Sequence, residues 1–123
     1  MDGIKGSPLG GLARLRRCTT RRASSWDRSG GNDDRLHIAP GQTAVLADIQ
    51  GAGTINHIWV TIDRQPRSEL HHLRKIILRA WWDGEETPSI EVPIGDFFGI
   101  GHGKTRNFTS LPLQMSPEGG RAF

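Results

Sequence analysis

From residue 36 onward, apolar and polar positions follow one another in short stretches that are typical of β-strands. The stretch at 54–62 is rich in β-branched and aromatic residues and has apolar side chains on both faces, as expected of a strand covered on both sides. Shorter stretches lie at 36–38, before the turn Pro40-Gly41, and at 43–49, before a glycine-rich turn. The pattern therefore predicts three strands in this part of the chain.

The stretch at 70–82 fits two different elements. Its leucines and isoleucines fall at helical spacing, which would suit an amphipathic helix. Its second half instead alternates as a strand does, and it is followed at once by Asp83-Gly84, the strongest short signal for a hairpin. We predict a hairpin whose corner is at this dipeptide and whose returning arm is 89–92, with a short helical turn at 68–72 left open.

Glycine and proline interrupt the remainder of the chain. Pro93 marks the returning arm as an edge strand or marks its end, because proline cannot donate to a strand ladder. Residues 95–106 form a glycine-rich, irregular segment, and 108–115 is predicted as one further strand broken by a proline. Gly119-Gly120 predicts a turn, after which 121–123 looks like a strand just beginning. The predicted fold class is all-β, and we expect the fold to be incomplete at its C-terminus.

Composition and charge limit the number of domains and the class of protein. The 123 residues suit one domain, although 16 Gly, 7 Pro and 35% hydrophobic residues make its core lean. Residues 1–35 carry eight Lys and Arg against four Asp and Glu, whereas residues 36–123 carry eight against nine. The chain is therefore divided into a basic, polar leader at 1–35 and an organised part at 36–123.

Several classes of partner and compartment are disfavoured. The single Cys18 excludes an internal disulfide, no apolar run reaches the length of a membrane span, and the N-terminus has no secretory apolar core. We expect a cytoplasmic protein without a membrane partner. The arginines of the leader could bind phosphate backbones, but no aromatic residues are interleaved with them, so we expect no nucleic-acid partner.

The segment 24–34 (SSWDRSGGNDD) carries the residue types that grip a polar ring. Sugar binding uses a flat apolar face under the ring and side chains that hydrogen-bond its hydroxyls, and both are present here. Trp26 would supply the face; the hydrogen-bonding side chains are Asp27, Arg28, Asn32 and Asp33. An equally open alternative is a hydrogen-bonded, Asx-rich loop that only positions its neighbours.

Other chemistry-bearing residues give weaker signals. The five histidines show no zinc-ligand spacing, so we expect no metal and no cofactor. His102, which lies between two glycines and near Asp96, is the one histidine kept as a candidate site residue. The adjacent carboxylates Asp33-Asp34 and Glu85-Glu86 rarely supply a glycosidase pair, because such a pair must face both sides of a sugar. No catalytic residue is assigned.

In longer strings the chain resembles the N-terminal part of glycoside hydrolase family 172. The resemblance runs from about residue 12 to residue 123 and is carried by SSWDRSGGNDD, VLADIQGAGTINHIWVTID, LRKIILRAWWDGEETPSIEVPIGDFFGIGHG and FTSLPLQMSPEGGRAF. It implies a jelly-roll sandwich, here the incomplete first half of a double jelly roll. It also implies a homo-oligomer, a trimer or hexamer, in the full-length form.

The resemblance also implies an activity on fructofuranosides and arabinofuranosides by a retaining mechanism with two glutamates. These glutamates lie downstream of the matching motifs, so the resemblance does not assign them to Glu85, Glu86, Glu91 or Glu118. It carries over only a set of substrate-binding residues: Trp26, Asp27, Arg28, Asn32, Asp33, Asp96 and His102. The leading hypothesis is a fragment of a furanoside-acting hydrolase that supplies sugar-binding loops. The alternative is a non-catalytic jelly-roll assembly module, in which these residues lock structural contacts.

Overall fold

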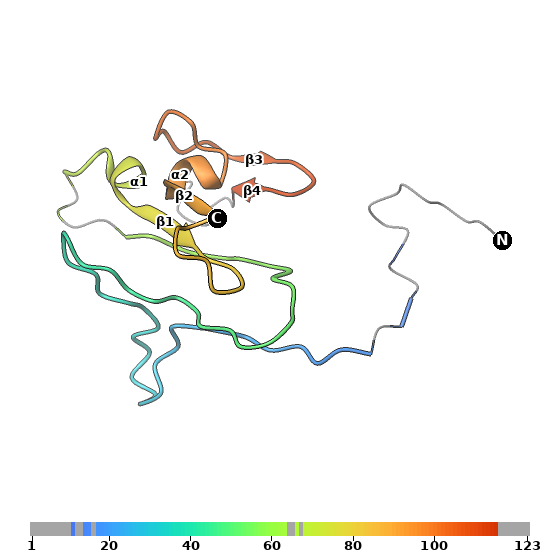
Figure 1. Cartoon of the computed structure of the whole chain (residues 1–123). Coiled ribbons are helices and arrows are strands. Elements are labelled where there is room, and N and C mark those ends of the chain that lie inside the picture. Colours follow the sequence, from blue (N-terminus) through green and yellow to red (C-terminus); the bar gives the residue numbers. More distant parts are fainter. Residues whose placement is uncertain (1–10, 12–13, 16, 64–65, 67, 116–123) are drawn as a thin grey trace. The chain divides into compact units, whose positions relative to one another are not determined.

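The computed structural model describes residues 11, 14, 15, 17–63, 66 and 68–115. The chain divides into two compact units, Met1–Ala52 and Gly53–Phe123, which are described separately below. All helices and strands found in the described residues belong to the second unit (Figure 1). The predicted turn at 119–120 and the predicted strand at 121–123 lie outside the described residues.

The first unit holds turns but, in its described residues, no helix or strand. The predicted turn at Pro40-Gly41 is confirmed, since the Gln42 amide donates to the Ala39 carbonyl at 3.0 Å. The strands predicted at 36–38 and 43–49 are wrong, because neither stretch pairs with another. A strand is defined by the neighbour that takes up its N–H and C=O groups, and β-branched composition does not supply one.

The predicted hairpin is confirmed in the second unit. Strands β1 (Ile77–Ala80) and β2 (Ile90–Pro93) pair antiparallel, from Ile77 opposite Pro93 to Ala80 opposite Ile90 (Figure 1). The helical alternative is realised only as one turn, α1 (His72–Lys75), which ends where Ile76 takes an extended conformation.

The corner of this hairpin has the geometry that its sequence favours. Asp83 and Gly84 have φ angles of 49° and 78°, and the Glu85 amide donates to the Trp82 carbonyl at 2.9 Å, as in a type I′ turn. β2 does not begin directly after this turn, because residues 85–89 lie between the turn and the first residue of β2. That stretch contains Pro88, which has no N–H to donate to a ladder.

The strand predicted at 54–62 is wrong apart from an isolated bridge at Thr61. Val60 and Ile62 pack against the core of the second unit, whereas Trp59 is 59% exposed. The segment therefore contacts the core through one side without joining a sheet. The prediction that both faces of this segment are covered is also wrong, since Ile55 and Ile58 are at least 41% exposed as well.

The region after β2 differs from the sequence prediction in two places. The segment predicted as irregular begins with a helical turn, α2 (Ile94–Phe97), because Pro93 ends the ladder and precedes the helix. The single strand predicted at 108–115 is two short strands, β3 (Phe108–Thr109) and β4 (Gln114–Met115), which pair antiparallel. The proline that was expected to break one strand lies in the turn between two.

A small apolar core holds the second unit together. Its buried members come from α1, α2, β4 and the segment after α2: Leu73, Ile94, Phe98, Ile100 and Met115. None of the four tryptophans belongs to it; Trp26, Trp59, Trp81 and Trp82 are all at least 43% exposed. The described chain is thus mostly non-helical with two small antiparallel sheets, which is compatible with the predicted β-rich fold.

Candidate functional site

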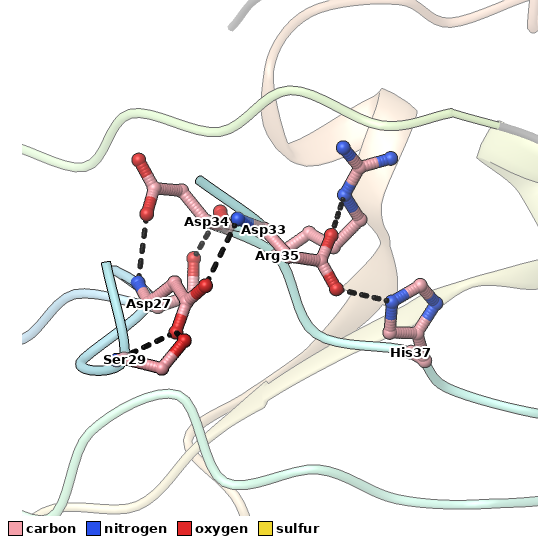
Figure 2. Close-up of polar contacts among 7 residues, drawn as sticks. Asp27, Ser29, Asp33, Asp34, Arg35 and His37 are labelled. Carbon is pink, nitrogen blue, oxygen red and sulfur yellow. Dashed lines mark hydrogen bonds and ion pairs between the residues drawn. The ribbon is translucent and has the colours of Figure 1, made fainter. Parts of the chain in front are cut away.

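The side chain of Asp27 organises the loop at residues 25–37 of the first unit, here called the Asp27 loop. Its Oδ1 accepts hydrogen bonds from the Ser29 amide at 2.8 Å and from the Ser29 hydroxyl at 2.7 Å. Its Oδ2 accepts one from the Asp33 amide at 3.2 Å. Figure 2 shows this carboxylate turned inward, between Ser29 and the chain near Asp33. One side chain therefore fixes two parts of the loop.

Further contacts close the loop at its base. Asp34 Oδ1 accepts from the Asp27 amide at 2.7 Å, and the Ser25 hydroxyl donates to the Asp34 carbonyl at 3.0 Å. Asn32 has a φ of 61°, a left-handed conformation that asparagine tolerates better than most residues. Gly31 lies so close to the carboxylate that a Cβ there would be 2.8 Å from Asp27 Oδ2.

Asp33 forms an ion pair with Arg35 and a hydrogen-bonded contact with His37. Its Oδ1 lies 2.5 Å from Arg35 Nε and its Oδ2 lies 3.2 Å from His37 Nε2, with all three side chains exposed (Figure 2). Exposed pairs of this kind contribute little stability, about 0–1 kcal/mol. Their effect is to direct both carboxylate oxygens of Asp33 toward neighbouring side chains.

Three of the predicted site residues remain available on the outside of the loop. Trp26 is 56% exposed, and Arg28 and Asn32 are exposed as well. The Arg28 guanidinium lies 5.8 Å from the centroid of the Trp26 ring, within the range of a cation–π contact. The loop can therefore offer an aromatic face, a guanidinium and an amide to a ligand, while Asp27 and Asp33 maintain its shape. Direct contact of these residues with sugar hydroxyls stays a prediction.

The hydrogen bonds of the loop lower the pKa of Asp27 below its ordinary value of 3.8, chiefly through the Ser29 hydroxyl and then through the amides of Ser29 and Asp33. A carboxyl with a lowered pKa stabilises the folded loop fully above its unfolded pKa. That contribution is lost only as the pH falls through the folded value, below 3.8. We expect Ser29→Ala to raise the pKa of Asp27 toward 3.8, measured by NMR titration of the carboxyl carbon. An unchanged pKa in this variant would contradict the role given to Ser29.

The other two predicted site residues lie in the second unit. Asp96, in α2, forms an ion pair with Arg74 of α1 through its Oδ2, and its Oδ1 is inaccessible to solvent without a hydrogen-bond partner among the described residues. His102 is exposed and lies in the segment that follows α2. The sequence analysis grouped these two residues because they are close in sequence, whereas the structure pairs Asp96 with Arg74.

Two shallow depressions on the surface of the second unit are lined by described residues. The larger has a volume of about 370 Å³ and lies beside α1; its lining is Pro66, Ser68, Glu69, Leu70, His71 and Lys75. None of the predicted site residues lines it.

Within the described part of the chain, no group of three or more His, Cys, Asp or Glu could hold a metal ion. The same residues include no helix of the length and apolarity that a membrane span requires.

Sequence reasoning missed the residues that hold the Asp27 loop. Ser29 had a signal, because a serine two residues after an aspartate is typical of an Asx turn. Arg35 and His37 lie near Asp33 in the sequence but match no motif. Arg74 had no signal at all, since it lies 22 residues from its partner Asp96.

A family model described as GH172 domain-like matches residues 31–119 of the chain. The matched residues include four of the predicted site residues: Asn32, Asp33, Asp96 and His102. Trp26, Asp27 and Arg28 precede the match. No curated protein matches the chain.

Proposed function

Because the chain belongs to the GH172 domain-like family, we propose that it contributes sugar-binding loops to a glycoside hydrolase that acts on fructofuranosides or arabinofuranosides. The family match over 31–119 is the observation that carries this proposal. No catalytic glutamate is assigned among these 123 residues. The proposal includes a jelly-roll sandwich as the complete fold and a trimer or hexamer as the full-length assembly.

The side chains of the Asp27 loop are chemically suited to a carbohydrate ligand. Its backbone is held by hydrogen bonds to Asp27, so the backbone of the loop loses little further freedom when a ligand binds. Trp26 offers a flat apolar face, and Asn32 offers both a donor and an acceptor. These are the groups that recognise a ring bearing hydroxyls.

A second function, a non-catalytic assembly module, is favoured by the apolar side chains that the first unit exposes. Val45 is 76% exposed, Ile49 is 60% exposed, and Leu46 is 51% exposed. Neighbouring apolar side chains that solvent reaches are typical of surfaces that contact another chain. In this function the hydrogen bonds of Asp27 and the side-chain contacts of Asp33 would serve only the shape of the loop.

A titration of the full chain with a fructofuranoside and an arabinofuranoside, measured by calorimetry, distinguishes the two functions. We expect Trp26→Ala to weaken binding about tenfold, since loss of a stacked aromatic costs on the order of 1.5 kcal/mol. Trp59→Ala, at a tryptophan that is 59% exposed in the second unit, is the matched control and should leave binding unchanged.

Asn32→Gly refines this test, because glycine accepts a φ of 61° and the change removes the side chain with its amide. We expect weaker binding with an unchanged NMR spectrum for the Asp27 loop. The assembly module would be favoured instead if the chain binds neither sugar and if its oligomeric state is unchanged by the sugars and by Trp26→Ala.

A further inference from the structure

Two arginines precede a pair of serines in the segment that leads into the Asp27 loop. The order Arg21-Arg22-Ala23-Ser24-Ser25 places an arginine three residues before each serine. All five residues are exposed, and residues 17–26 form no helix, strand or turn. Neither guanidinium pairs with a carboxylate of the described residues. Because neither its backbone nor its charges are engaged, this segment can enter the groove of another protein in an extended form.

The two serines differ in what their hydroxyls contact. Ser25 Oγ donates to the Asp34 carbonyl at 3.0 Å and so lies at the base of the closed loop. Asp34 is itself held there, because its Oδ1 accepts from the Asp27 amide at 2.7 Å. The Ser24 side chain is exposed and makes no hydrogen bond within the part of the chain that the structure describes. The loop therefore engages one hydroxyl and leaves the neighbouring one accessible.

We propose that Ser24 is a phosphorylation site for a protein kinase that recognises basic residues. A kinase of this class binds an extended substrate and pairs arginines two and three residues before the acceptor with carboxylates of its own. Ser24 Oγ attacks the γ-phosphorus of ATP, the bond from this phosphorus to the β–γ bridging oxygen breaks, and ADP leaves. The hydroxyl proton passes to the catalytic aspartate of the kinase. This modification goes beyond the proposed function and does not depend on it.

Phosphorylation would change the charge of the segment that leads into the Asp27 loop. Residues 17–24 contain three arginines and no carboxylate. A phosphoserine adds a charge of about −1.5 to −2, which would cancel at least half of this positive charge. Thr19 follows Arg16 and Arg17 at the same spacing, but Arg16 lies outside the described residues, so the proposal is confined to Ser24.

The test incubates the full chain with ATP and the catalytic domain of a kinase selective for arginines two and three residues before its acceptor. Mass spectrometry of peptides locates the phosphate, and the same peptides are sought in the chain isolated from its source cells. The variants are Ser24→Ala, Ser25→Ala, Arg21→Ala and Arg22→Ala. The matched control is Arg79→Ala, which removes an exposed arginine that has no serine or threonine in the three residues after it.

We expect phosphate on Ser24 in the unaltered chain and, at an equal rate, in Ser25→Ala. Arg21→Ala and Arg22→Ala should each lower kcat/KM about tenfold or more, since each removes a charge-assisted contact, whereas Arg79→Ala should leave it unchanged. Ser24→Ala should remain largely unmodified, because the Ser25 hydroxyl is bound to the Asp34 carbonyl. Adding Asp27→Ala to Ser24→Ala should increase phosphorylation of Ser25, because the bonds that hold the loop are lost.

Four results would overturn the proposal. If Ser25 is phosphorylated as fast as Ser24, the contact with the Asp34 carbonyl does not select the acceptor. Equal rates for Arg21→Ala, Arg22→Ala and Arg79→Ala would reject recognition of the two arginines. Phosphate on Thr19 alone would reject Ser24 as the acceptor. Absence of phosphate on Ser24 in the chain isolated from its source cells would reject the modification itself, whatever the purified kinase does.

Discussion

Replacing Leu73 with alanine is expected to lower the free energy of unfolding of the second unit by about 2–5 kcal/mol, the range for truncation of a buried leucine. Leu73 is 1% exposed, and it belongs to the core that joins α1 to α2 and β4. The truncation removes the buried methyl groups and leaves a cavity, because a core this small has few neighbours that could fill the space.

The measurement is a urea titration followed through the methyl NMR signals of Ile94 and Ile100, two other members of the core. The matched control is Leu70→Ala, the same change three residues earlier at a side chain that is 64% exposed. We expect the control to change the free energy of unfolding by no more than about 0.5 kcal/mol. Equal effects of the two substitutions would contradict the assignment of Leu73 to the core.

The second large effect is expected at Gly95, where α2 crosses α1. A Cβ at this position would lie 2.9 Å from Leu73 Cβ and 3.2 Å from the Leu73 carbonyl oxygen, and neither atom can move without shifting the backbone of α1. We therefore expect Gly95→Ala to lower the free energy of unfolding by about 1–3 kcal/mol, the usual cost of overpacking. The same urea titration measures it.

Gly101→Ala is the control for this substitution, because a Cβ at Gly101 would meet no atom within 4 Å. It should keep the stability or raise it by up to about 1 kcal/mol, through the restricted freedom of the unfolded chain. Leu73→Ala retains both atoms that Gly95→Ala would strike, so the double variant should be no more stable than either single variant. If the double variant has a higher free energy of unfolding than Gly95→Ala, the close approach is not with Leu73 Cβ or the Leu73 carbonyl.

The sequence predicted those parts of the fold whose cause is local. Asp83-Gly84 predicted a hairpin corner because few dipeptides accept two successive positive φ angles, and the corner formed there. The strands predicted at 36–38, 43–49 and 54–62 failed, since pairing depends on a neighbouring strand that composition does not specify. The helical turn α2 was missed because four residues carry too little periodicity to distinguish a helix from a loop.

The candidate site divides in the same way. The sequence identified the Asp27 loop from its polar residues, but it could not decide whether a carboxylate there binds a ligand or the loop itself. In the structure both oxygens of Asp27 accept bonds from the loop, which no count of residue types would indicate. The ion pair of Arg74 with Asp96 joins two helical turns that are far apart in sequence, so only the tertiary fold reveals it.

The exposure of all four tryptophans has a consequence for spectroscopy. Since the core of the second unit contains leucine, isoleucine, phenylalanine and methionine but no tryptophan, intrinsic fluorescence should emit near the wavelength of solvated indole in the folded chain and should change little on unfolding. The wavelength of tryptophan emission can therefore report binding. A blue shift on adding a saccharide or another protein chain would show that an indole exposed in the folded chain has become buried.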